Sequence, residues 1–76
     1  MSINKNQKVQ QYLDTVLQQI EYREVHEEIR VVLESRMNEL IGFYNLKAVS
    51  EEEAIHKAIT EMGDPVELGK ELAWLE

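Results

Sequence analysis

The two histidines lie in the stretches that come nearest to a known metal-binding pattern. His26 lies in VHEEIR, where H-E-x-x begins the zinc motif H-E-x-x-H, but Arg30 occupies the position of the second histidine. A guanidinium stays protonated and has no lone pair to offer a metal. The stretch therefore predicts no zinc site, and we expect His26 to lie on an exposed polar face of its helix.

The other histidine has the spacing that di-iron helical bundles use. Glu53 and His56 form one E-x-x-H pair, whereas those bundles need a second such pair and two further inward glutamates. Counting three residues back from His26 gives Arg23, so the second pair is missing. Cysteine is absent and no glycine-rich phosphate loop occurs. We predict no enzymatic activity, no metal and no cofactor, and we expect His56 to be exposed.

The charge of the chain is unevenly distributed. The net charge of the 76 residues is −7, and residues 39–76 hold three Lys or Arg against nine Asp or Glu. An acidic surface repels nucleic acids, because their binding depends on Lys and Arg. We therefore predict no nucleic-acid partner. The acidic half is either a solvated helical surface or a face that selects a basic partner.

The chain has neither a secretory signal nor a membrane span in its sequence. The N-terminal stretch MSINKNQKVQQYLD has no apolar run after its lysines. No stretch approaches the roughly 18 apolar residues of a transmembrane helix. We expect a cytoplasmic domain, and membrane association only through a segment that follows it.

The elements that would position any functional residue are helices. Apolar residues recur at intervals of three and four over about residues 6–20 and again over about residues 23–44. Two further helices are expected at about 51–62 and 65–75. A length of 76 residues fits a single domain. The prediction is an all-α bundle of three main helices plus a short C-terminal fourth, with the second helix as its spine.

A capping box marks the start of the third helix. The Ser50 hydroxyl can accept from the backbone N–H of Glu53, whose carboxylate can reach back to the N–H of Ser50. Alanines on the apolar face of this helix should allow close approach to the spine. In the preceding turn, Asn45 is expected to end the spine helix in a left-handed conformation.

The stretch MGDPVE predicts a rigid corner between the third and fourth helices. Gly63 can adopt the positive φ that ends a helix. Asp64 is a strong N-cap, Pro65 suits the first helical position, and Glu67 completes a second capping box. One helix should therefore stop where the next begins, at a fixed angle.

The stretch SEEEAIHKAITEMGDPVELGKEL resembles the signature of the bacterial permease prefix and HAAS-type domains. VQQYLDTVLQQI is similar to the first helix of that family, and EVHEEIRVVLESRMNELI is similar to the second. Arg36 departs from the family, which often has a histidine there. The resemblance implies a small all-helical cytoplasmic signalling module placed ahead of transmembrane segments, and it implies no enzymatic activity.

Two functional hypotheses follow. The first is a cytoplasmic interaction or regulatory module, the N-terminal prefix of a bacterial membrane-associated protein. The second is a free-standing soluble regulator that acts by self-association or by binding a basic protein. The closing residues Leu75 and Glu76 match what a common C-terminal tag junction leaves, in which case the natural chain continues past Trp74.

Surplus apolar residues suggest where a partner would bind. Val32, Ile41 and Phe43 widen the apolar stripe of the spine helix, and Trp74 faces away from the leucines of the fourth helix. Such residues either complete the core or mark a partner surface. We predict a self-association or partner surface that includes Phe43, Trp74 and Leu75.

Overall fold

The protein is described by a computed structural model, in which residues 6–47 and 50–74 are placed. Its elements are all helical, which confirms the predicted all-α bundle with a short last helix: α1 (Gln7–Gln18), the 3-10 turn η2 (Arg23–Val25), α2 (His26–Asn45), α3 (Glu51–Met62) and α4 (Pro65–Trp74). No strand occurs among the described residues.

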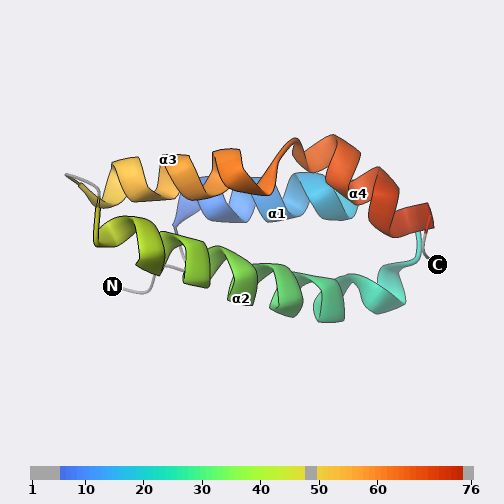
Figure 1. The fold of residues 1–76 in the computed structure, drawn as a ribbon. Coiled ribbons are helices and arrows are strands. Elements are labelled where there is room, and N and C mark those ends of the chain that lie inside the picture. Colours follow the sequence, from blue (N-terminus) through green and yellow to red (C-terminus); the bar gives the residue numbers. More distant parts are fainter. Residues whose placement is uncertain (1–5, 48–49, 75–76) are drawn as a thin grey trace.

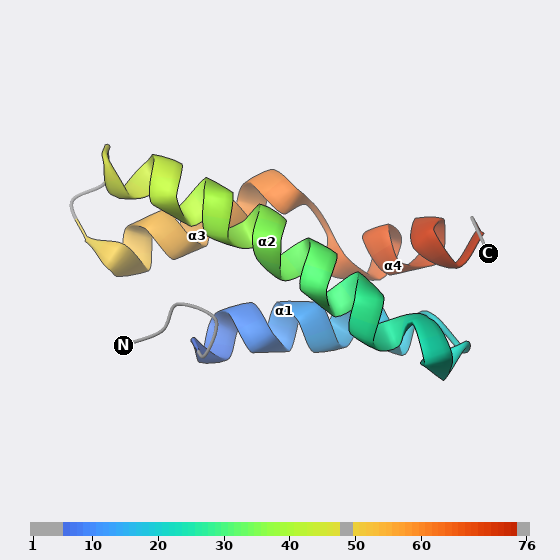
Figure 2. The ribbon, with the colours of Figure 1, turned by 90° about the horizontal axis from the view of Figure 1, so that it is seen from below.

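The longest helix, α2, extends along most of the bundle, while α3 and α4 follow each other along one side (Figure 1). Seen from below, α2 crosses the bundle obliquely (Figure 2). Its C-terminal half lies beside α3 and its N-terminal half lies near α1. Because α4 packs against α1 and not closely against α2, the N-terminal half of α2 and α4 diverge.

The core forms where the apolar stripes of α1, α2 and α3 meet. Its most fully buried large side chains are Leu13, Met37, Ile41, Ile55, Val9 and Val16. Ala54 and Ala58 are also fully buried, and α3 packs extensively against α2, as the small residues predict. Ile41 therefore belongs to the core and is not a surplus apolar residue.

The first helix begins at a side-chain cap, and the link that follows it accepts a hydrogen bond from a half-buried histidine. Asn6 Oδ1 accepts from the backbone N–H groups of Lys8, at 2.9 Å, and Val9, at 3.3 Å. After the helix, His26 Nε2 lies 2.7 Å from the carbonyl oxygen of Ile20. Since a carbonyl can only accept, this nitrogen donates. The expectation that His26 lies on an exposed polar face is wrong, because its side chain is half-buried and makes a hydrogen bond to the segment that joins α1 to α2.

The end of α2 also differs from the prediction. Asn45 is helical, the next residue Leu46 has φ −73° and ψ −18°, and no described non-glycine residue has a positive φ. The helix ends through tightened i→i−3 bonds, from Leu46 N–H to the Phe43 carbonyl and from Lys47 N–H to the Tyr44 carbonyl. A left-handed Asn45 is not needed because these bonds satisfy the terminal carbonyls.

Candidate functional site

The serine half of the predicted capping box is present at the start of α3. Ser50 Oγ accepts from the backbone N–H of Glu53 at 3.2 Å. The Glu53 carboxylate lies 4.0 Å from the Lys57 ammonium, one turn later on α3. These two contacts are local to the helix, and the cap sets where α3 begins.

The corner between α3 and α4 depends on glycine and aspartate. Gly63 has φ 93° and ψ −170°, a conformation that residues with a Cβ almost never adopt. Asp64 Oδ1 accepts from the backbone N–H groups of Val66, at 2.8 Å, and Glu67, at 3.2 Å. Pro65 is the first residue of α4. Both the positive φ and the N-cap thus occur where the sequence predicts them.

A tyrosine of α1 fastens this corner to the bundle. The Tyr12 hydroxyl donates to the carbonyl oxygen of Gly63 at 2.9 Å, and its ring is almost fully buried. Burial raises the pKa of Tyr12, and the nearby Asp64 carboxylate raises it further. The corner is therefore held by a contact between residues 51 positions apart, which no local pattern indicates.

A glycine brings α4 close to α1. Gly69 is the buried residue of α4. A Cβ placed on it would overlap the carbonyl oxygen of Val16 and lie 2.7 Å from Cβ and Cγ of Gln19. A side chain at this position would push α4 away from α1. Sequence reasoning missed this role, because a glycine inside a helix is a signal of close packing only when the opposing surface is known.

An apolar groove lies between the diverging halves of the bundle. Its volume is about 180 Å³, it is open to solvent, and its lining residues are Glu28, Ile29, Val32 and Leu33 of α2 and Leu72 of α4. We call it the α2–α4 groove. Val32 is 65% exposed there, although four of the five lining side chains are apolar. The groove therefore presents apolar side chains to solvent between two helices.

Carboxylates border this groove on both helices. Glu28 lies in its α2 wall. On α4, Glu67 and Glu71 line a second hollow together with Asp64 and with Leu68, which is one helical turn before Leu72. Successive helical residues are 100° apart, so Glu67 and Glu71, which directly precede Leu68 and Leu72, lie on the side of α4 that is turned away from Gly69 and α1. They form the outer edge of α4, which we call the acidic edge.

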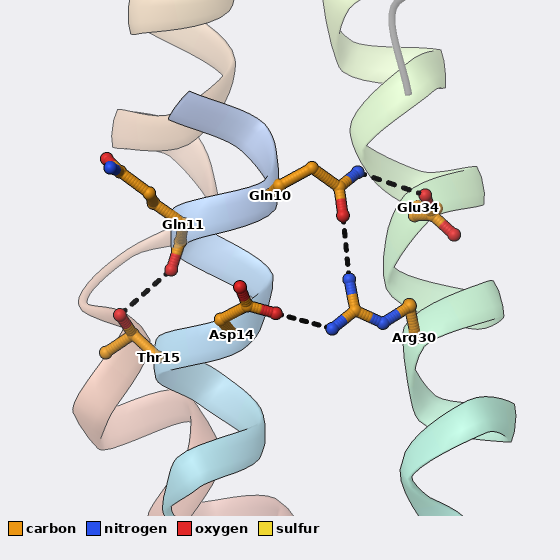
Figure 3. A network of polar contacts seen from close by, with 6 residues as sticks. All are labelled: Gln10, Gln11, Asp14, Thr15, Arg30 and Glu34. Atoms are coloured by element: carbon orange, nitrogen blue, oxygen red, sulfur yellow. Dashed lines mark hydrogen bonds and ion pairs between the residues drawn. The ribbon is translucent and has the colours of Figure 1, made fainter. Parts of the chain in front are cut away.

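A polar network fixes the α2 wall to α1 on the other side (Figure 3). The Arg30 guanidinium donates to Gln10 Oε1 at 2.8 Å and pairs with the Asp14 carboxylate. Gln10 in turn donates to Glu34 at 3.4 Å. Figure 3 shows these side chains reaching toward one another from α1 and α2. The residue that replaces the second histidine of a zinc motif thus joins two helices.

The predicted aromatic surface is divided by the fold. The last turn of α2, with Phe43, lies at one end of the bundle, and α4 ends with Trp74 at the other (Figure 1). Phe43 is half exposed and lies under the Lys47 ammonium, 4.8 Å from its ring centroid, whereas Trp74 is 88% exposed. The two aromatic residues do not share one surface. Leu75 lies outside the described residues.

The nearest approach to a reactive cluster lies between α2 and α3. Tyr44, His56, Lys57 and Glu61 line a shallow hollow there, and His56 is exposed as predicted. The Tyr44 hydroxyl donates to the Glu61 carboxylate, and this hydrogen bond raises the pKa of Tyr44. A raised pKa moves the phenol away from the deprotonated form in which a tyrosine acts as a nucleophile or base.

Two further observations concern the part of the chain that the structure describes. No group of three or more His, Cys, Asp or Glu side chains converges there in a way that could hold a metal. None of its helices combines the length and the apolar composition that a membrane crossing requires.

Comparisons of the chain with protein-family models, with curated proteins and with solved structures give no significant match. The resemblance to permease prefix domains therefore stays a prediction.

Proposed function

We propose that this chain is a non-enzymatic protein-interaction module that holds a helical segment of a partner protein in the α2–α4 groove. The observation that carries the proposal is the groove itself, where the exposed Val32 and the half-buried Ile29 and Leu72 lie between two helices. A helix that lays its apolar face into a hydrophobic groove is a recurrent mode of peptide recognition. An inserted helix would cover side chains that the bundle leaves exposed.

Both walls of the groove are held in place before any partner arrives. The α2 wall is joined to α1 by the Arg30 network. The α4 wall is held by the close approach of Gly69 to α1 and by the hydrogen bond from Tyr12 to Gly63. A site that is already formed spends little of its binding energy on reorganisation. These contacts favour the groove over the scattered exposed aromatics as the binding site.

The resemblance to permease prefix domains supports a cellular setting for this module. We propose that it lies in the cytoplasm as the N-terminal prefix of a bacterial membrane-associated protein, and that it acts in signalling or regulation. The rival is a free-standing regulator. An apolar span of roughly 20 residues encoded after Trp74 would favour the first. A stop codon at that point would favour the second.

Site-specific photocrosslinking tests the groove as the binding site. Val32 and Val31 are adjacent, 65% and 53% exposed, and only Val32 lines the groove. A photoreactive phenylalanine at position 32 should form a covalent adduct with a partner protein. That partner is then purified, and it should bind the wild-type chain. The same group at position 31 is the matched control and should form no such adduct.

The outcomes separate the hypotheses. An adduct that forms equally from both positions, or from neither, refutes the groove as the docking site. A crosslink from position 32 to a second copy of this chain would instead support the self-associating regulator.

A further inference from the structure

The carboxylates around the α2–α4 groove have no ion-pair partner in the part of the chain that the structure describes. Among the described residues, ion pairs join Lys8 to Glu52, Arg30 to Asp14 and Lys57 to Glu53, all away from the groove. Neither Glu28 nor the glutamates of the acidic edge take part in an ion pair within that part of the chain. The borders of an apolar groove therefore carry uncompensated negative charge.

One cation lies on the same side of α2. Arg36 is one helical turn beyond Val32, so it stands at the end of the groove nearer the corner. Three glutamates outnumber this one arginine, so the borders of the groove carry net negative charge; they are Glu28, Glu67 and Glu71. Lys70 of α4 is on the far side of that helix, beyond the acidic edge.

We infer that the α2–α4 groove binds an amphipathic helix whose apolar stripe is flanked by Lys and Arg. This inference rests on the proposed function, and it assigns the chemistry of the partner. The apolar stripe would contact Ile29, Val32 and Leu72, and the flanking cations would reach Glu28 on one side and the acidic edge on the other. Complementary charges at the edge of an interface raise the association rate and select among partners.

The helix beside the groove sets the length of a helical occupant that lies along it. Leu72 is the α4 residue that lines the groove, and α4 as a whole has ten residues, which is about 15 Å. A guest helix of about three turns spans that length, with apolar residues at i, i+3 or i+4, and i+7. A longer guest would extend past the corner at Gly63 or past the end of α4.

The same charges argue against other occupants. A second copy of the chain would bring its own net charge of −7 to an acidic border. Nucleic acids and anionic lipid surfaces would be repelled for the same reason. A basic helix is the occupant for which both the apolar floor and the charged borders of the groove are favourable.

Three designed peptides of about 15 residues, stapled to be helical, provide the test. They share one stripe of leucines at i, i+4 and i+7 and differ only at the flanking positions, which are Lys, Gln or Glu. Binding to the whole chain is measured by titration calorimetry at low and at moderate salt. We expect the Lys peptide to bind about tenfold more tightly than the Gln peptide at low salt, with a smaller ratio as salt increases. The Glu peptide should bind most weakly.

Paired variants locate the effect. Glu28→Gln should weaken binding of the Lys peptide several-fold, whereas Glu27→Gln, an adjacent exposed glutamate outside the groove, should leave it unchanged. Val32→Ser should weaken binding of both the Lys and the Gln peptides, and Val31→Ser neither. Circular dichroism of each variant checks that the fold is retained.

The outcomes distinguish this inference from the proposed function. If the Lys and Gln peptides bind equally and both are sensitive to Val32→Ser, the groove binds helices and the basic partner is refuted. If every peptide binds the Val32→Ser and Val31→Ser variants with the same affinity, both the proposed function of the groove and its preference for a basic helix are refuted.

Discussion

Replacing Gly69 by alanine tests how α4 is held against α1. A Cβ at this position would overlap the Val16 carbonyl oxygen. That oxygen cannot move aside easily, because it belongs to the helix backbone and accepts from the N–H of Gln19 at 3.1 Å. The overlap can be relieved only by a shift of α4, which also carries the Leu72 wall of the groove.

Two opposing effects set the magnitude for Gly69→Ala. Overpacking of a well-filled contact costs about 1–3 kcal/mol. Alanine is favoured over glycine within a helix by about 1 kcal/mol. The net result for Gly69→Ala should be a loss of roughly 0–2 kcal/mol in the free energy of unfolding.

A second helical glycine provides the matched control. A Cβ at Gly42, in α2, would meet no atom within 4 Å. Gly42→Ala should therefore show the helix effect alone and stabilise the chain by about 1 kcal/mol. Because the helix effect is common to both variants, their difference isolates the overlap cost, which should be about 1–3 kcal/mol.

Urea unfolding followed by circular dichroism measures both variants, and thermal unfolding provides a second reading. For a domain of this size, each kcal/mol corresponds to roughly 4–8 °C in Tm. Equal stabilisation by Gly69→Ala and Gly42→Ala would show that α4 does not depend on close approach at Gly69, and the argument for a fixed α4 wall would fail.

Four further predictions concern the corner and the exposed aromatics. Tyr12→Phe should lower the free energy of unfolding by about 0.5–1.5 kcal/mol through loss of its hydrogen bond to Gly63; an unchanged urea midpoint would show that this bond is dispensable. Because the pKa of Tyr12 is raised above 10.0 in the folded chain, the unfolded chain loses its phenolic proton first. Stability should therefore fall as the pH rises above 10, and a Tyr12→Phe variant with the same alkaline profile as wild type would contradict this cause. Asp64→Ala should cost about 0.5–2 kcal/mol as a lost N-cap, and Gly63→Val should cost more because of its positive φ; unaltered melting temperatures for both would refute the corner. Sedimentation of wild type against Phe43→Ser and Trp74→Ser should show a monomer throughout, since Phe43 belongs to the last turn of α2 and Trp74 to the end of α4, which lie at opposite ends of the bundle; a wild-type dimer lost in both variants would restore the shared aromatic surface.

The helices and their ends follow from contacts within a few residues, which is why they can be predicted from sequence. Apolar periodicity places the four helices to within about three residues of their observed bounds, and the largest difference is at the start of α2, where Arg23–Val25 form the 3-10 turn η2. The cap at Ser50 and the corner at Gly63 and Asp64 are also local, because each depends on backbone groups at most four positions away. Asn45 is the exception, since tightened bonds at the end of α2 remove the need for a left-handed residue.

The contacts that shape the candidate site are long-range, and no spacing rule reveals them. Tyr12 meets Gly63 across 51 positions, and Arg30 meets Asp14 across 16. His26 was expected on a polar face, yet its ring reaches back to the Ile20 carbonyl because the link between α1 and α2 turns there.

What the sequence determined by itself is the set of helices, their apolar faces and the acidic character of the second half. Only the tertiary structure decided which faces meet. Val32 and Ile41 both widen the apolar face of α2, but they are nine residues apart and therefore lie on opposite sides of the helix. The tertiary structure buries the side with Ile41 in the core and leaves Val32 at the open groove. The angle at which helices cross depends on side chains from several elements at once, such as the missing Cβ at Gly69. The periodic pattern of a sequence shows how wide the apolar face of a helix is, whereas the crossing angle determines how much of that face the neighbouring helices bury.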